Sequence, residues 1–205
     1  LIVSDISNPF YAKIIRAVED ALNAYNYNLI VCSSDENLEK ERSLIQMLEY
    51  KQVDGMIIST SSPGGDDFTN TIPAEIPFVL VDRYLPDVQT HYVCTDNFSG
   101  AKKLTTHLLD QGHRDIVVLS HHPLHLSSLH DRKQGIRKAF ADYSLKFDDS
   151  NLIDVPFNDR YNHVFKEMEQ KIQKGKPDAV FCLNNSLSIA FLDFCKQKAL
   201  QIPED

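Results

Sequence analysis

Short apolar segments alternate along this chain with polar turns and longer amphipathic segments. In residues 10–25 the apolar side chains, among them Phe10, Ile14 and Val18, recur at helical spacing. The runs Val53–Ser59 and Phe78–Val81 are short and almost continuously apolar, as in strands buried on both faces. The repetition predicts an α/β fold in which helices cover both faces of a parallel sheet.

The same pattern predicts where the individual strands and helices lie in the sequence. Composition leaves two architectures open, because one doubly wound sheet and two smaller sheets fit the strand count equally well. The longest irregular stretch is expected at residues 59–77. Strands are expected near 1–4, 29–32, 53–59, 78–81, 92–95, 116–119, 152–155 and 179–183, and helices near 10–25, 38–48, 99–111, 128–143, 159–174 and 186–198.

Charge and composition narrow the class of protein. The 205 residues carry a formal net charge of −8, whereas binding to nucleic-acid phosphates needs a clustered basic surface. This segment is therefore not expected to bind DNA itself. No apolar run approaches the roughly 18 residues of a membrane span, and no signal-peptide pattern opens the sequence. The four cysteines lack any CxxC pairing, which indicates reduced thiols in a cytosolic protein.

Asn8-Pro9-Phe10-Tyr11 directly follows the first apolar run and opens a helix. Pro9 suits the first helical turn, and Asn8 is a good capping residue. A plain helix cap with two core aromatics would explain the motif. An amide beside two aromatic rings also suits a hydroxyl-rich ligand at the carboxyl end of a strand, where open α/β sheets bind ligands.

Polar side chains follow the other expected strands as well. Singly, each is explained by a helix cap or a surface ion pair. Together on one edge, two amides, a carboxylate, two guanidiniums and several hydroxyls would suit hydrogen bonding to a polyol, with bidentate bonds from arginine. The residues concerned are Asn8, Phe10, Tyr11, Ser59, Asp82, Arg83, His122, Arg132 and Asn184.

Histidines at 121, 122, 125 and 130 raise the alternative of a metal or enzyme site. Pro123 lies among them and the segment is typical of a loop, so the spacing fixes no geometry. We expect solvated loop histidines, with His122 a candidate contact to a ligand. The sequence contains no phosphate-binding loop and no nucleophile elbow, so neither an enzyme nor a cofactor or metal site is expected.

Several motifs together resemble, in order and spacing, the LacI/GalR family of bacterial transcription regulators over nearly the whole chain. They are Asn8–Tyr11, Val53–Ile58, Ile76–Arg83, Gly112–Ile116, Arg132–Ile136, Pro177–Phe181 and Ile202–Asp205. The resemblance implies a type I periplasmic-binding-protein fold with two Rossmann-like lobes, residues 1–97 and 98–205. It also implies ligand contacts from Asn8, Phe10, Asp82, Arg83, Arg132 and Asn184, and from an aromatic near Phe157.

Three departures from the family pattern stand out. Asn185 replaces an acid beside the cleft, and Ala199 replaces a glycine near the end of the last helix, which predicts a changed helix ending. The third is length: the family's helix-turn-helix and hinge, and strands completing both lobes, are expected to lie outside this sequence. The second lobe is therefore expected to be incomplete.

The resemblance implies the effector-binding core of a cytoplasmic, sugar-responsive repressor of a carbohydrate-utilisation operon. Its expected partners are a small sugar or sugar derivative, operator DNA through the helix-turn-helix, and a second copy in a homodimer. Some members of the family use a phosphocarrier corepressor, for which these residues give no argument. The alternative is an extracytoplasmic sugar-binding protein that feeds a transporter, which shares the fold.

Overall fold

The computed structural model describes residues 1–122 and 125–204, so Pro123 and Leu124 of the histidine segment lie outside the described residues. The chain divides into two compact units. Unit 1 comprises Leu1–Thr95 and Leu126–Ser128, and unit 2 comprises Asp96–His125 and Leu129–Asp205. No helix in the described ranges is long and apolar enough to cross a membrane.

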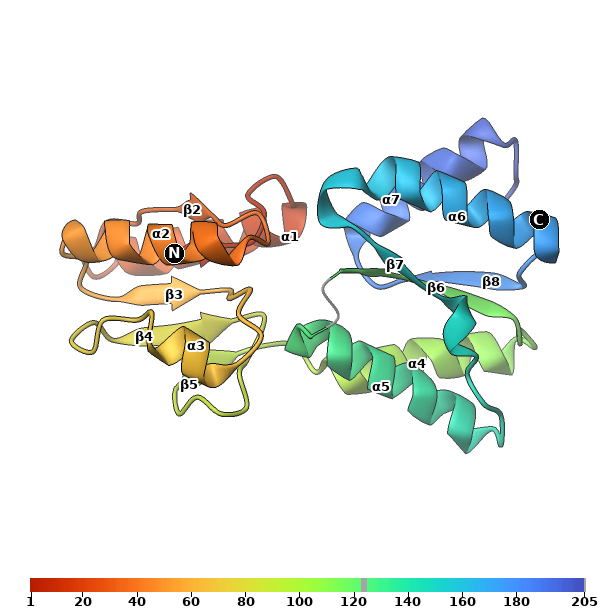
Figure 1. The fold of residues 1–205 in the computed structure, drawn as a ribbon, viewed down its shortest axis with the longest axis horizontal. Helices are drawn as coiled ribbons and strands as arrows, with labels where there is room; N and C mark the ends of the chain where they lie inside the picture. The colour runs from red at the N-terminus through yellow and green to blue at the C-terminus, as the bar shows by residue number, and fades with distance from the viewer. Residues whose placement is uncertain (123–124, 205) are drawn as a thin grey trace. The chain divides into compact units, whose positions relative to one another are not determined.

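Unit 1 is built on a five-stranded parallel sheet with the order β2-β1-β3-β4-β5 (Figure 1). The strands are β1 (Ile2–Val3), β2 (Cys32–Ser33), β3 (Met56–Ile58), β4 (Phe78–Val81) and β5 (His91–Val93). The helices are α1 (Pro9–Asn23), α2 (Leu38–Tyr50) and the short α3 (Gly65–Thr69).

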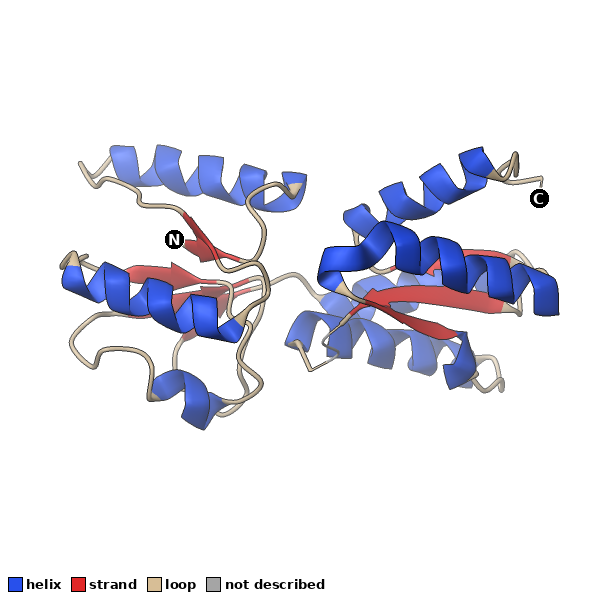
Figure 2. Cartoon of the chain, turned by 45° about the horizontal axis from the view of Figure 1, so that its top comes forward, coloured by secondary structure: helices blue, strands red, loops and turns tan. Residues whose placement is uncertain are grey.

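Side chains along the strands of unit 1 point alternately to the two faces of the sheet, and helices pack against both faces. Val3 and Ile57 point to the face where Tyr11 of α1 packs. Ile2 and Ile58 point to the opposite face, which α2 and α3 cover. Helices consequently lie on both sides of the sheet, as Figure 2 shows.

Unit 2 contains a three-stranded parallel sheet with the order β7-β6-β8. Helices α4 and α5 lie on one side of this sheet and α6 and α7 on the other (Figure 1). β6 lies between β7 and β8, and all six of its residues are buried. The strands are β6 (Ile116–His121), β7 (Leu152–Val155) and β8 (Ala179–Cys182); the helices are α4 (Asn97–Asp110), α5 (Ser127–Asp142), α6 (Arg160–Lys174) and α7 (Asn185–Gln197), with 3-10 turns at Asp149–Asn151 and Phe157–Asp159.

The predicted α/β class with parallel sheets and flanking helices is confirmed, and of the two architectures left open the structure has two sheets. The strand expected at 29–32 is present but shifted toward the C-terminus, because β2 comprises Cys32 and Ser33. Ahead of it, the Ile30 carbonyl accepts a hydrogen bond from the Leu1 amino group at 2.8 Å, and the Cys32 N–H donates to the Leu1 carbonyl at 2.9 Å. The irregular stretch at 59–77 contains α3.

The end of α7 keeps a left-handed residue although glycine is missing there. Ala199 adopts φ +54°, and the Leu200 N–H donates to the Cys195 carbonyl at 2.9 Å. Gly112 closes α4 in the same way with φ +93°. An alanine here takes the left-handed conformation that glycine adopts at lower cost.

Candidate ligand-binding site

Asn8 and Phe10 lie where the chain passes from β1 into α1. The Asn8 side chain caps the helix, accepting a hydrogen bond from the Phe10 N–H at 3.0 Å, with Pro9 at the first helical position. Phe10 remains 40% exposed, and its ring meets the Tyr11 ring edge-on at 5.0 Å. An exposed aromatic ring held by a buried one is a surface on which the apolar face of a ligand can pack.

Tyr11 joins three strand ends of unit 1 beneath Phe10. Its buried hydroxyl donates to the Asp82 carboxylate at 2.9 Å and lies 3.0 Å from the Ser59 hydroxyl. Burial raises the pKa of Tyr11 to about 12, so the phenol stays protonated as a donor. Asp82 itself adopts φ +68°, an unusual conformation for a non-glycine residue, directly after β4.

Arg83 is 6% exposed and already bound inside unit 1. One terminal nitrogen donates to Glu36 at 2.8 Å and to the Thr60 carbonyl at 3.0 Å, and the other donates to the second Glu36 oxygen. Arg83 Nε lies 3.7 Å from Asp82 Oδ2 and has no hydrogen-bond partner among the described residues. Burial alone would raise the pKa of Glu36, yet the Arg83 charge holds it below its usual value.

Glu41 of α2 supports the hydroxyl run that follows β3. Only 1% exposed, it accepts from the Thr60 hydroxyl at 2.6 Å and from the Ser61 N–H at 2.7 Å. Burial raises the pKa of this carboxyl above its usual value. A buried acid thus fixes the backbone beside Ser59.

In unit 2, Arg132 of α5 reaches the end of β8. Its Nε donates to the Asn97 side chain at 2.8 Å, and a terminal nitrogen donates to the Leu183 carbonyl. Arg132 is therefore held directly beside Asn184, the capping residue of α7.

Asn184 belongs to a chain of hydrogen bonds at this edge of unit 2. Its side-chain oxygen accepts from the Leu187 N–H at 2.9 Å and from the Ser186 hydroxyl at 3.0 Å. Ser186 in turn lies 3.0 Å from Nε2 of His121, whose Nδ1 lies 3.2 Å from the Val155 carbonyl. The carboxyl ends of β6, β7 and β8 are linked in this way.

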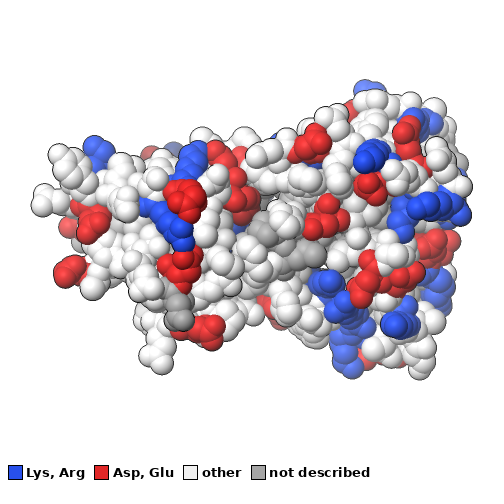
Figure 3. Space-filling model, viewed as in Figure 1, with Lys and Arg blue, Asp and Glu red and all other residues white. Residues whose placement is uncertain are grey.

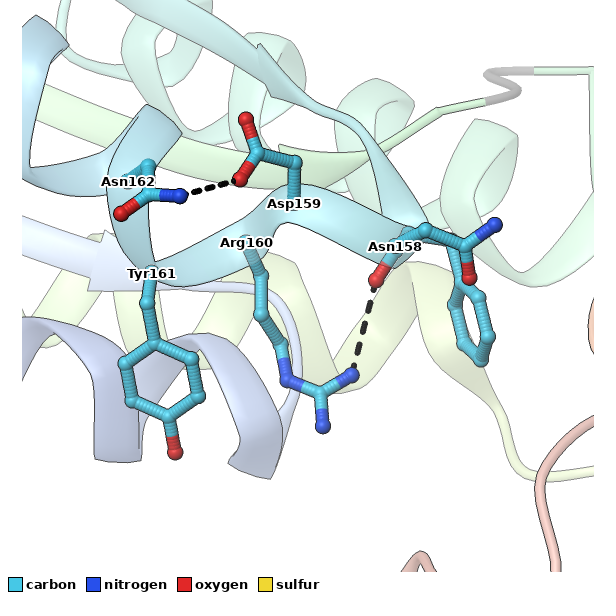
Figure 4. A pocket seen from close by; sticks show the side chains of 6 residues that line it. Asn158, Asp159, Arg160, Tyr161 and Asn162 are labelled. Atoms are coloured by element: carbon cyan, nitrogen blue, oxygen red, sulfur yellow. Dashed lines mark hydrogen bonds between the residues drawn. The ribbon is translucent and has the colours of Figure 1, made fainter.

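Phe157 follows β7 and lines an open hollow of about 290 Å³ at the start of α6 (Figure 4). Its ring centre lies 5.8 Å from that of His121. Arg160 projects into the same region; it donates to the Phe157 carbonyl at 3.5 Å, and its guanidinium lies 5.8 Å from the Tyr161 ring. Asn162 donates to Asp159 at 2.7 Å at the far end of the hollow.

His122 points elsewhere than its neighbour His121. Its side chain is 67% exposed and lies 3.0 Å from Asp154. Among residues 1–122 and 125–204, no group of three or more His, Cys, Asp or Glu side chains is arranged to hold a metal ion.

The structure groups the predicted residues within each unit. In unit 1 it brings together Tyr11, Ser59, Asp82 and Arg83, with Phe10 against Tyr11. In unit 2, Arg132, Asn184 and Phe157 surround the ends of β6 and β8, while His122 pairs with Asp154 on the surface.

Four residues of these clusters were not predicted from the sequence: Glu36, Glu41, His121 as a buried partner, and Arg160. Burial of Glu41 could have been predicted from the sequence, because it shares a helical face with Leu44 and Leu48, where a charge is unexpected. Burial of Glu36 could not, since it sits in a polar turn whose shape only the folded chain defines.

Charges of both signs are mixed on the one face of the molecule that Figure 3 shows. There, Lys and Arg side chains are interspersed with Asp and Glu. This distribution agrees with the net charge of −8 and offers no concentrated basic surface on that face.

Two parallel-sheet units with polar and aromatic groups at their strand ends define a ligand-binding α/β protein. The family model described as "Periplasmic binding proteins and sugar binding domain of LacI family" matches residues 1–205. The chain belongs to this family.

Two curated relatives are transcriptional repressors rather than enzymes. The HTH-type transcriptional repressor PurR of Photobacterium profundum is 28% identical over 208 residues, covering 100% of this chain and 61% of its own length. The ribose operon repressor of Halalkalibacterium halodurans is 37% identical over 138 residues, covering 67% of this chain and 40% of its own. The chain thus spans only part of the relatives it matches.

A solved structure shares the fold. It is that of the Cra transcriptional dual regulator from Pseudomonas putida in complex with fructose 1-phosphate, with a TM-score of 0.83 and 24% identity. The match covers 98% of this chain and 73% of that one.

Proposed function

We propose that this chain is the effector-binding part of a sugar-responsive, DNA-binding repressor of a carbohydrate-utilisation operon. Membership of the LacI-type sugar-binding family over all 205 residues carries the proposal. The repressor names of the two curated relatives support the regulatory role over that of a transport protein. A sugar phosphate in the Cra structure supports a sugar or sugar derivative as ligand.

The effector contacts come from the strand ends of each unit. In unit 1, Phe10 offers an apolar ring, while Asn8 and Asp82 are hydrogen-bonding groups next to it. In unit 2, Phe157 offers the second ring, and Arg132 and Asn184 are the polar groups. Rings against C–H faces and amides or carboxylates against hydroxyls are the chemistry that a sugar requires.

Effector binding would regulate the affinity of the protein for operator DNA. An effector that binds one arrangement of the two units more tightly than others shifts the population toward that arrangement. In a homodimeric regulator with a DNA-binding part, the shift changes operator affinity by the same coupling free energy. We place operator DNA and a second copy of the protein among its partners.

A thermal-shift screen of the intact protein against sugars, sugar acids and sugar phosphates tests the proposal. One ligand class should raise the melting temperature, since a ligand that binds only the folded state stabilises it. Asp82→Ala and Arg132→Ala should abolish the rise, because each removes a polar group at the strand ends.

Matched controls are Asp20→Ala and Arg16→Ala, whose side chains are 55% and 72% exposed on α1 and pair only with each other or with Glu19 among the described residues. These variants should keep the full ligand-induced rise. A rise that survives both Asp82→Ala and Arg132→Ala would place the effector elsewhere on the protein.

A further inference from the structure

Four buried charged residues meet at one edge of unit 1, and we call them the acidic network: Glu36, Glu41, Asp82 and Arg83. The exposed fractions are 1% for Glu41, 9% for Asp82 and 6% for Arg83, and 10% for the Glu36 side chain. Glu36 binds the guanidinium, Asp82 lies 3.7 Å from its Nε, and Glu41 is held nearby by Thr60 and Ser61. Because Asp82 accepts from Tyr11, which in turn contacts Ser59, the charge of the network acts on the proposed effector site.

Glu36 takes most of the hydrogen-bonding capacity of Arg83. Its two oxygens bind the two terminal nitrogens, and the Thr60 carbonyl accepts a further bond. Nε, which faces Asp82 at 3.7 Å, is the guanidinium donor without a hydrogen bond to any described residue. An arginine paired in this way cannot offer a bidentate fork to a phosphate or carboxylate of a ligand.

The backbone is shaped to keep this pairing. Asp35 and Glu36 adopt consecutive positive φ values of +54° and +53°. Residues with side chains disfavour this conformation, and such strain concentrates at functional positions. The turn between β2 and α2 thus has an unfavourable backbone conformation that places the Glu36 carboxylate against Arg83.

Adding a further negative charge beside Glu36, Glu41 and Asp82 would be energetically unfavourable. Burial already raises the pKa of Glu41, with the Glu36 charge acting in the same direction. A phosphate or carboxylate of a ligand would enter the same poorly solvated region and face Asp82 and Glu36 with no uncommitted arginine fork to meet it.

We propose that Glu36 is a positioning residue that sets effector specificity: by neutralising Arg83, it makes the site select an uncharged sugar over a sugar phosphate or sugar acid. This inference rests on the proposed function. The Asp82 carboxylate, at a residue that is 9% exposed, remains to pair with hydroxyl groups. The Cra structure with fructose 1-phosphate shows that a protein of this fold accommodates an anionic sugar, so the selection is a property of these residues rather than of the fold.

The test compares neutral and phosphorylated forms of one sugar by calorimetric titration of the intact protein. The pairs are ribose and ribose 5-phosphate, fructose and fructose 1-phosphate, and glucose and glucose 6-phosphate. The wild type should bind the neutral member of one pair at least tenfold more tightly. Glu36→Gln should lower this ratio at least tenfold, because the two terminal nitrogens of Arg83 lose their bidentate carboxylate partner while Asp82 still faces only Nε.

Glu39→Gln is the matched control, since it removes an equal charge from a 79% exposed side chain nearby in sequence, and it should leave the ratio unchanged. Tighter wild-type binding of a phosphate ester would overturn the inference, as would equal weakening of both ligands in Glu36→Gln. If that variant does not fold, the wild-type preference decides alone. Binding of no sugar of either kind would instead overturn the proposed function, and the inference with it.

Discussion

Individual residues around Arg83 show how strain and electrostatics are balanced in unit 1. Glu36 and Asp82 both adopt positive φ, and both direct carboxylates toward the guanidinium. Leaving one partner of a buried pair without the other costs about 3–5 kcal/mol, which is comparable with the backbone strain of Glu36 and Asp82 at about 1–2 kcal/mol each. The pairing therefore keeps the strained conformations in place.

The Glu36–Arg83 pair should give a defined acid sensitivity. Arg83 holds the folded-state pKa of Glu36 below its usual value of about 4.5, so the pair stabilises the fold fully above that pH. As pH falls through the lowered folded-state pKa, the contribution is lost. The difference in unfolding free energy between wild type and Glu36→Gln, from urea denaturation, should shrink below about pH 4.5. Glu39→Gln should show no such trend.

The Tyr11 hydroxyl offers a second test at this scale. Tyr11→Phe leaves the ring packing intact but deprives buried Asp82 and Ser59 of their shared partner. We expect a loss of about 1–3 kcal/mol in unfolding free energy by urea denaturation. Tyr50→Phe, at an 89% exposed position, is the control and should change nothing. Equal stability of Tyr11→Phe would mean that the hydroxyl contributes no net stabilisation.

At the scale of elements, close contact between α4 and α5 depends on one glycine. A Cβ at Gly135 would overlap the Phe98 carbonyl oxygen and lie 3.0 Å from the Lys102 nitrogen. Both neighbouring atoms are backbone, so the helices themselves would have to separate. This contact sets the position of α5, which carries Arg132 to the end of β8.

Gly135→Ala should therefore destabilise the protein by about 1–3 kcal/mol through overpacking, despite the better helix propensity of alanine. Gly100→Ala in α4 is a matched control, because its added Cβ meets nothing within 4 Å. That variant should gain about 0.5–1 kcal/mol. Thermal unfolding should show a lower melting temperature for Gly135→Ala and a higher one for Gly100→Ala. A raised melting temperature in Gly135→Ala would show that α4 and α5 tolerate the separation.

At the scale of the whole molecule, each unit has its own hydrophobic core. One core gathers around Ile58, Leu80 and Phe68 in unit 1, and another around Leu119, Val155 and Phe194 in unit 2. Separate cores allow each unit to open with its own free energy.

Leu119→Ala should cost about 2–5 kcal/mol, because it empties a fully buried position of the unit 2 core. Hydrogen exchange should show the loss of protection concentrated in β6, β7 and β8. Ile58→Ala is the counterpart for unit 1 and should act on β1, β3 and β4. Equal loss of protection in both units from either change would mean that the chain unfolds as one cooperative body.

The sequence by itself determined the α/β class, most of the helices and strands, the strand-end positions of Asp82 and Asn184, and the place of Arg132 on a helix. These follow from periodicity and from local rules for caps and turns, which act over a few residues. Periodicity alone left the number of sheets open, whereas the family resemblance implied two lobes. The late start of β2 and the left-handed Ala199 required the folded chain. Only tertiary structure decided that Glu36 meets Arg83, 47 residues away, and that His121 rather than His122 is buried beside Phe157. Such pairings depend on long-range packing and desolvation, which no local pattern encodes.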